Sequence, residues 1–339
     1  MVPSSRDQVL RLIETLEACD IVVMLVPLSC ESLWLYKALS RRHQPYVALR
    51  LGLLPSGQPR AAQTNWLDGW RWRIRRLRDT IRWTSAILRA NAVPDRWSLT
   101  APRWVLRGGR GESLPTYFPK PWKARGLKVH SFDVEKARYS PAASAVSPVA
   151  GDYAVFLDEG MTNHPDYDLV NVPRQVSPQR YGEAMGKLFT LVHQQFGWEV
   201  VIAGHPRINY EGSPLPGRVI QDATAPLVRG ARLVLAHNST SVSFAVLFRK
   251  PLLFITTDEL ERGIYRDWIL RMALWFGLSP LNADHVDSRS HLAMPVVDEA
   301  RWAAYEACFL REPDAPDRSI WDSLLSAWDH HDVGVGGAP

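Results

Sequence analysis

Three short polar clusters carry the residue types that chemistry needs, and each directly follows an apolar run. Asp158-Glu159-Gly160 follows AVFL, residues 204–207 (GHPR) follow VVIA, and residues 237–241 (HNSTS) follow LVLA. Apolar runs of this length, bounded by polar turns, are typical of buried strands in a parallel sheet. Because the carboxyl ends of parallel strands meet at one edge, we predict that the three clusters converge on one ligand.

The serine-rich cluster predicts an anion site. Ser239, Thr240 and Ser241 are expected at a helix start, where hydroxyls and backbone N–H groups meet the positive end of the helix dipole. His205 and Arg207 can donate to the same phosphate or to a sugar carboxylate, which would neutralise a leaving group as its bond breaks. The remaining members expected in a donor site are Pro206, His237 and Asn238.

The acidic cluster could act at the reacting carbon of such a ligand. Glu159 or Asp158 would serve as a general base for an attacking hydroxyl or as a nucleophile, and one carboxylate suffices. The structural alternatives are a solvated turn for the acids, a satisfied turn residue for His205 and a helix cap for Ser239. Further residues that could reach the same cleft are Gly160, His164, Asp166, His130 and Asp133.

Alternating strands and helices must position these clusters. In the C-terminal half, strands are predicted at 153–157, 198–203, 218–220, 233–236 and 252–255, with helices at 177–196, from 224, and at 239–248. This alternation predicts a parallel sheet with helices on both faces. Segments 259–276, 298–310 and 318–328 are predicted to be helices.

The N-terminal half is predicted to be a second α/β unit. It shows an apolar run at 21–26, helical spacing at 29–39, and further strands at 104–106 and 127–130. The Ser, Ala and Pro composition of SPAASAVSPVAG suits an exposed connection better than a packed element. We therefore predict an N-terminal domain over residues 1–145, a ligand-binding domain over 151–310 and a terminal helix and tail over 311–339.

Length and composition set limits on the class of protein. A chain of 339 residues with 46% hydrophobic and 22% charged residues is expected to fold as two compact domains. Its longest apolar runs are too short to cross a bilayer and its N-terminus lacks a signal-peptide pattern, so a cytoplasmic location is expected. Cys19, Cys30 and Cys308 are odd in number and lack metal-ligand spacing, which argues against a disulfide framework and a zinc site.

Positive charge is concentrated in one short stretch. The net charge is +5, and six arginines interleaved with tryptophans fall between Arg71 and Arg82. The spacing predicts a basic amphipathic helix over residues 66–88. A solvated helix face and a peripheral contact with the anionic inner membrane both stay open. No recognisable nucleic-acid module accompanies the arginines, so no nucleic-acid partner is expected.

The clusters resemble the motifs of a known enzyme class. Asp158-Glu159-Gly160, His205-Pro206 and Ser239-Thr240 resemble the D/E-D/E-G, HP and S-S/T motifs of bacterial sialyltransferases and of transferases for Kdo and other nonulosonic acids. The stretches HSFDVEKARYS, LDEGMTNHPDYD and AGHPRINYEG are similar to transferases of bacterial surface-polysaccharide loci, over about residues 127–258. The resemblance implies a GT-B fold, in which two Rossmann-type domains with parallel sheets face a central cleft and the terminal segment packs back on the first domain.

The resemblance also implies an activity. It is the transfer of a nonulosonic-type sugar (Kdo, sialic, pseudaminic or legionaminic acid) from a CMP-activated donor to a glycan or lipid-linked glycan acceptor, without a metal or other cofactor. Glu159 would be the base, and His205 and Ser239 would contact the CMP phosphate. The nucleotide sugar would bind in the C-terminal domain over residues 151–310, and the acceptor would lie on the N-terminal domain over residues 1–145. Glu159 and His205 share a predicted domain, as in retaining Kdo transferases rather than several sialyltransferases, so inverting and retaining chemistry both stay open. The alternatives are a GT-B transferase for a nucleoside-diphosphate sugar and a non-catalytic, membrane-associated scaffold of polysaccharide assembly.

Overall fold

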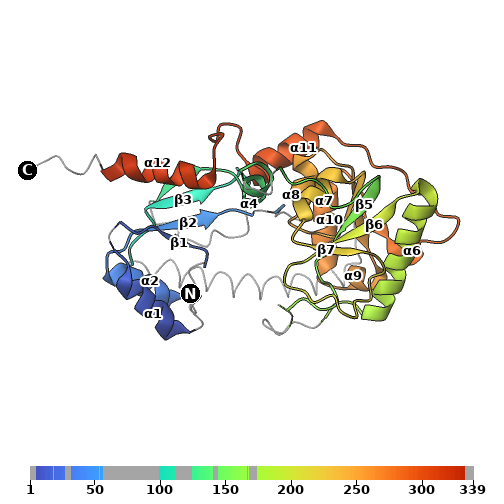
Figure 1. The fold of residues 1–339 in the computed structure, drawn as a ribbon, viewed down its shortest axis with the longest axis horizontal. Helices are drawn as coiled ribbons and strands as arrows, with labels where there is room; N and C mark the ends of the chain where they lie inside the picture. The colour runs from blue at the N-terminus through green and yellow to red at the C-terminus, as the bar shows by residue number, and fades with distance from the viewer. Residues whose placement is uncertain are drawn as a thin grey trace, which may run out of the picture.

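The computed structural model describes residues 5–17, 19–26, 32–52, 54–55, 99–111, 124–139, 144–165, 167 and 174–332. The predicted arginine helix over residues 66–88 lies outside these ranges. The described elements form two α/β units, each built on its own parallel sheet (Figure 1). No helix in the described ranges is both long and apolar enough to cross a membrane.

The first unit is a four-stranded parallel sheet in the order β1-β2-β3-β4. Tyr36 and Leu39 of the helix Leu33–Arg41 pack with Tyr46 of the sheet and form much of the buried core between them. Strand β2 and helix α1 were not predicted. The elements are α1 (Arg6–Thr15), β1 (Val22–Met24), α2 (Leu33–Arg41), β2 (Tyr46–Arg50), β3 (Trp104–Arg107) and β4 (Arg125–Lys128).

The second unit is a six-stranded parallel sheet in the order β10-β9-β8-β5-β6-β7. The strand order reverses between β8 and β5, which is where sheets of this kind bind ligands. Five predicted strands are confirmed, and β10 was not predicted. The strands are β5 (Tyr153–Leu157), β6 (Glu199–Gly204), β7 (Val219–Gln221), β8 (Leu233–Ala236), β9 (Leu252–Thr256) and β10 (Leu281–Asn282).

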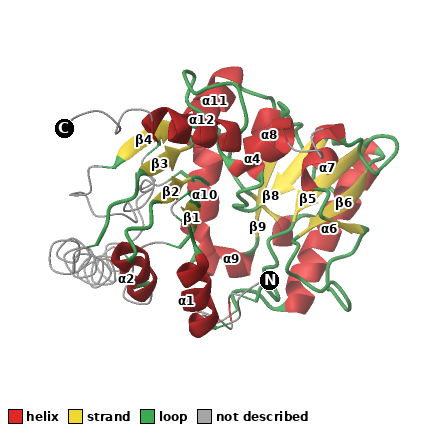
Figure 2. Ribbon diagram, turned by 60° about the vertical axis from the view of Figure 1, so that its left-hand side comes forward, coloured by secondary structure: helices red, strands yellow, loops and turns green. Residues whose placement is uncertain are grey.

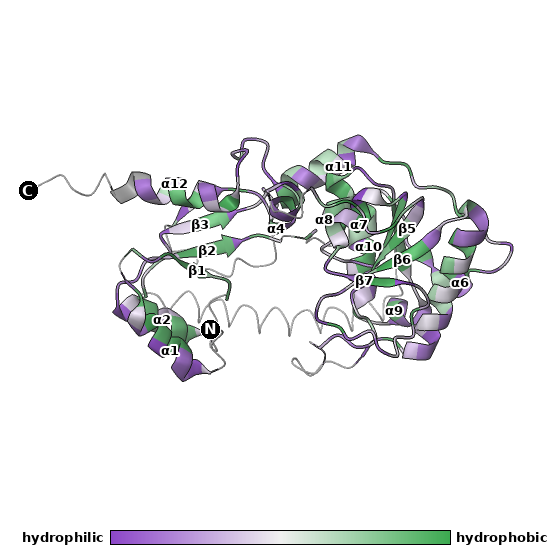
Figure 3. Cartoon of the chain, viewed as in Figure 1, coloured by the Kyte–Doolittle hydropathy of each residue, from purple (hydrophilic) through white to green (hydrophobic). Residues whose placement is uncertain are grey.

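Helices cover both faces of this second sheet, and Figure 2 shows it between α6 on one side and α7 and α8 on the other. Successive residues of β5 face opposite ways, with Val155 in one core and Phe156 in the other. Figure 3 shows β5 and β6 as hydrophobic, as expected of strands buried on both faces. The helices are α6 (Pro178–Phe196), α7 (Thr224–Gly230), α8 (Val242–Leu247), α9 (Asp258–Arg262), α10 (Tyr265–Trp275) and α11 (Glu299–Tyr305).

The single helix predicted over residues 259–276 is wrong, because Gly263 divides it into α9 and α10. Gly263 adopts an extended backbone conformation that ends α9. A Cβ atom at this position would lie 2.6 Å from Oε1 of Gln175. Gly263 and Ile264 separate the two helices, and α10 starts at Tyr265.

The chain crosses between the two units near its end. Helix α12 (Ile320–Asp332) lies along the first sheet, where Ile320, Leu324 and Trp328 pack with Val47 and Leu106 (Figure 1). In the opposite direction, the short helix α4 (Phe132–Val134) and the π-helix η1 (Glu135–Tyr139) pack into the core of the second unit.

The Glu135 carboxylate connects the start of α12 to the segment between the two units. Glu135 accepts hydrogen bonds from the Ser319 hydroxyl (2.7 Å) and the Ile320 N–H (2.9 Å) at the start of α12. Its Oε2 also lies 2.7 Å from Nε2 of His130. Burial alone would raise the pKa of Glu135, but these partners outweigh it and the pKa is lowered. The carboxylate therefore stays charged and binds α12 to the segment that links the units.

Candidate functional site

A pocket of about 1060 Å³ opens at the carboxyl edge of the second sheet. Glu159 follows β5, His205 follows β6 and Ser239 follows β8, and all three line this pocket. Leu54 and Lys136, which precede β5, contribute to the wall. The structure thus brings the three predicted clusters together at the topological switch point, on a pocket large enough for a nucleotide sugar.

Asp158 ties two of the strand-end loops together. Its side chain is buried, and Oδ1 accepts a hydrogen bond from the Gly160 N–H at 3.1 Å. Its Oδ2 accepts a 2.5 Å bond from the Tyr210 hydroxyl, whose oxygen accepts the His205 N–H at 2.7 Å. Burial raises the pKa of Asp158, and these donors counteract that increase. With both oxygens engaged, Asp158 is built to position the His205 loop.

Gly160 is required for the same contact between loops. Its φ of +65° lies in the left-handed region that favours glycine. A Cβ atom here would lie 1.9 Å from Cδ1 of Ile208, which belongs to the loop after β6. The glycine therefore lets the β5 and β6 loops pack directly against one another.

Glu159 bridges from the end of β5 to the end of β8. Its carboxylate accepts a hydrogen bond from the Asn238 N–H at 2.8 Å. Burial raises the pKa of Glu159 to about 8, although the Asn238 and Ser239 N–H groups oppose the rise; the charge of Asp158 adds to it. A carboxyl group with a pKa near the working pH is suited to accepting a proton in a reaction.

The two histidines of the pocket lie next to each other. The ring centroids of His164 and His205 are 4.8 Å apart in an edge-to-face arrangement. Nδ1 of His205 accepts a hydrogen bond from the Arg207 N–H at 3.3 Å. A neutral His205 ring must then carry its proton on Nε2, where it can be donated to an anionic ligand.

The predicted helix start at Ser239 is wrong, because α8 begins at Val242. Thr240 and Ser241 form a turn before it, and α8 has only six residues. The helix dipole therefore contributes less than the sequence suggested. The hydroxyls remain usable: Ser239 Oγ accepts the Ser241 N–H at 3.2 Å and keeps its own proton for donation. All three hydroxyl residues line the pocket.

His237 was predicted in the donor site, but it is a core residue. It is fully buried, and its Nδ1 lies 2.8 Å from the Ile255 carbonyl oxygen, which can only accept. Nδ1 therefore carries the proton, and Nε2 accepts the Tyr181 hydroxyl at 2.7 Å. Burial lowers the pKa of His237 to about 4, so the ring is neutral and holds β8 against β9 and α6. His237 is not among the described residues that line the pocket.

The other predicted residues divide into two groups. Asp133, His164, Pro206, Asn238, Thr240 and Ser241 line the pocket. His130 does not, because it is fully buried beside Glu135, and burial lowers its pKa. Arg207 is exposed and does not belong to the described lining of the pocket. Gly160 contributes through its backbone conformation. Asp166 lies outside the described residues.

Several pocket residues were missed from the sequence. Asp222 directly follows β7 and has a φ of +57°, which is unusual for a residue other than glycine. It follows a strand just as the three clusters do, so the same rule could have found it. Lys136 and the aromatic residues Tyr265 and Trp268 also line the pocket. Their sequence signals are those of ordinary amphipathic helices.

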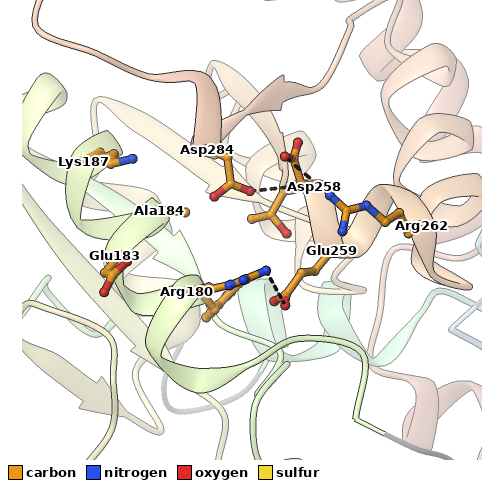
Figure 4. Close-up of a pocket in the computed structure, with 10 residues that line it drawn as sticks. Arg180, Glu183, Ala184, Lys187, Asp258, Glu259, Arg262 and Asp284 are labelled. Carbon is orange, nitrogen blue, oxygen red and sulfur yellow. Dashed lines mark hydrogen bonds and ion pairs between the residues drawn. The ribbon is translucent and has the colours of Figure 1, made fainter.

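A second pocket of about 240 Å³ lies beside α6, lined largely by charged side chains (Figure 4). Asp284 accepts the Asp258 N–H at 2.8 Å, and Arg180 lies 3.9 Å from Glu259. Arg262 lies 3.7 Å from Asp258. These charges compensate one another, and none of the predicted site residues lines this pocket.

The sequence matches no protein-family model and no curated protein. Among solved structures, it is similar to the glycosyltransferase SnogD from Streptomyces nogalater, with 15% identity, TM-score 0.48 and coverage of 95% of this chain and 75% of that one. It is also similar to MnaA of S. aureus bound to UDP, with 10% identity, TM-score 0.46 and coverage of 98% and 81%. Such distant likenesses carry no conclusion about activity. The chain's own two parallel α/β units define a GT-B-like, Rossmann-type fold.

Proposed function

We propose that the protein is a glycosyltransferase that binds a nucleotide-activated sugar at the carboxyl edge of its second sheet. One observation carries the proposal: Glu159, His205 and Ser239 line a single pocket at the switch point of the sheet. They supply a proton-accepting carboxyl group, an imidazole donor and a hydroxyl donor. These groups can accept the acceptor's proton and stabilise a departing phosphate, two tasks of glycosyl transfer.

The proposed reaction assigns a role to each group. The hydroxyls of Ser239, Thr240 and Ser241 and the Nε2–H of His205 bind the donor phosphate and stabilise the charge that it gains on leaving. In the inverting form, Glu159 takes the proton of the acceptor hydroxyl while that oxygen bonds to the anomeric carbon. As that bond forms, the bond from the anomeric carbon to the phosphate oxygen breaks, and its electron pair stays on the phosphate. In the retaining form, the Glu159 carboxylate attacks the anomeric carbon while the phosphate leaves with the electron pair of the broken bond. The acceptor oxygen then displaces Glu159 from that carbon, and its proton passes to the departed phosphate or to water.

We propose a CMP-activated nonulosonic acid as the donor, on the motif resemblance and on the distribution of charge. Such a donor carries two separate negative charges, the phosphodiester and the sugar carboxylate. The pocket offers two separate groups of donors for these charges, the His205 imidazole with the hydroxyls of residues 239–241, and the ammonium group of Lys136. A nucleoside-diphosphate sugar, with both charges on adjacent phosphates, is the alternative. The acceptor is a glycan or lipid-linked glycan.

Calorimetry with CMP, UDP and TDP tests both the proposed transferase function and the proposed CMP-activated donor. We expect CMP to bind most tightly and the Ser239→Ala variant to bind it at least tenfold more weakly. Tighter binding of UDP or TDP would replace the CMP donor with a diphosphate donor. If none of the three nucleotides binds, the transferase proposal itself fails. Glu159→Gln and Asp158→Asn variants that retain full transfer would exclude catalysis by either carboxylate.

A further inference from the structure

The pocket has an aromatic wall at one end. Tyr265 and Trp268 on the first turn of α10, with Ile264 just before them, all line it. Ile264 is 51% exposed and Trp268 is 45% exposed, and both are adjacent to Tyr265 in the lining of the same pocket. The rings of Tyr265 and Trp268 meet edge to face at 5.5 Å. The wall is therefore a contiguous apolar surface that opens into the pocket.

Hydrogen bonds hold this wall in place. The Tyr167 hydroxyl donates to the Met161 carbonyl oxygen at 3.2 Å, and its oxygen lies 3.1 Å from the Tyr265 hydroxyl. Because the Tyr167 proton is already used, Tyr265 is the donor of the second bond. Met161 directly follows the acidic loop. The aromatic wall is thus fixed relative to Glu159, and a ligand meets a preorganised surface.

Strand order places the wall on the opposite side of Glu159 from the β7 end of the pocket. Along the edge, the order is β9, β8, β5, β6 and β7. The aromatic wall follows β9, Glu159 follows β5, and Asp222 follows β7. Ser239, after β8, and His205, after β6, flank Glu159, so the donor phosphate would lie across the middle of this edge. We place the nucleoside on the β7 side of that phosphate, where Asp222 lines the pocket, which leaves the aromatic wall on the β9 side for the acceptor.

We infer that Ile264, Tyr265 and Trp268 form the acceptor subsite and that it binds the apolar face of a saccharide ring. This inference rests on the proposed transferase function. A pyranose ring presents C–H groups on its faces, which pack on an indole ring, and hydroxyls at its edge. The edge hydroxyls would meet Glu159 and the tyrosine hydroxyls. A long alkyl chain would leave these polar groups without partners.

Binding to an oligosaccharide array tests the inference without requiring transfer. Wild-type protein, Trp268→Ala and Trp268→Phe would be compared with Trp321→Ala, a control on α12 whose side chain is 42% exposed outside the pocket lining. We expect Trp268→Ala to weaken saccharide binding at least tenfold, Trp268→Phe to weaken it less, and Trp321→Ala to leave it unchanged. Trp268→Phe retains a ring and so keeps the test valid if the alanine variant folds poorly.

Three results would overturn the inference: equal saccharide binding by wild type and Trp268→Ala, no binding to any saccharide on the array, or a preference for a fluorescent decyl-chain probe. Loss of CMP binding by Trp268→Ala in calorimetry would place the nucleoside on the wall and equally refute it. If the wild type binds no nucleotide but binds saccharides through Trp268, the transferase proposal fails while the saccharide site stands.

Discussion

Replacing Glu159 with glutamine should stabilise the protein at alkaline pH while removing transfer activity. Burial raises the pKa of Glu159 from 4.5 to about 8 in the folded protein. Between these values the folded state holds a proton that the unfolded chain has released, so this carboxyl reduces stability progressively as pH rises from about 4.5 to 8. Glutamine stays neutral at every pH and keeps an oxygen that can accept the Asn238 N–H.

The magnitude follows from the pKa difference. At about 1.4 kcal/mol per pKa unit, the stability lost by pH 9 has an upper limit of about 5 kcal/mol. Because the Glu159 residue as a whole is partly exposed, we expect Glu159→Gln to gain about 1 to 3 kcal/mol at pH 9 relative to wild type. At pH 5 the side chain is protonated in the fold, and the gain should largely disappear.

Urea unfolding at pH 5 and pH 9 measures the difference, with the exposed Glu211→Gln as the matched control. The same variants serve in a pH-rate profile. In the inverting form, wild-type kcat/KM should rise with pH and level off above about 8, where Glu159 has lost its proton. A stability gain that is equal at both pH values would refute the reasoning, as would a rate that does not depend on pH between 6 and 9.

Three further perturbations test the loops that hold the site. Tyr210→Phe removes the bond to Asp158 and leaves the His205 N–H without its partner, so unfolding free energy should fall by about 1 to 3 kcal/mol and nucleotide affinity should fall with it, as urea unfolding and calorimetry would show. Gly160→Ala should destabilise by about 2 kcal/mol or more, measured as a lower melting temperature, and a second change, Ile208→Ala, should recover part of the loss. His205→Gln should reduce kcat about 100-fold with little change in melting temperature; an unchanged kcat would remove its proposed role at the phosphate.

The second sheet and its polar clusters could be predicted because the pattern of apolar and polar residues within short segments determines them. Strands such as β5 and β8 are buried on both faces and read as unbroken apolar runs. Parallel topology then fixes the edge at which the following polar residues emerge. Asp222 could have been found by the same rule. Its short strand, β7, is only partly buried, and the residue stands alone rather than in a cluster.

The roles of individual residues could not be predicted, since they depend on tertiary contacts. His237 and Asn238 are neighbours in one polar cluster, but one side chain packs between Tyr181 and Ile255 while the other lines the pocket. The start of α8 was also ambiguous, because successive hydroxyl residues can each cap a helix. The Tyr210 bridge joins loops that are distant in sequence, and no local pattern indicates it.

The packing of α12 on the first sheet has a consequence for biosynthesis. Val47 and Leu106 of the first sheet precede the second unit in the chain, whereas Ile320, Leu324 and Trp328, which cover their apolar surface, follow it. The first unit therefore cannot cover this surface until the second unit has been translated, whereas the second sheet draws its strands from one continuous stretch. Nascent chains that terminate before Ile320 should expose this surface and be recognised by chaperones or degraded.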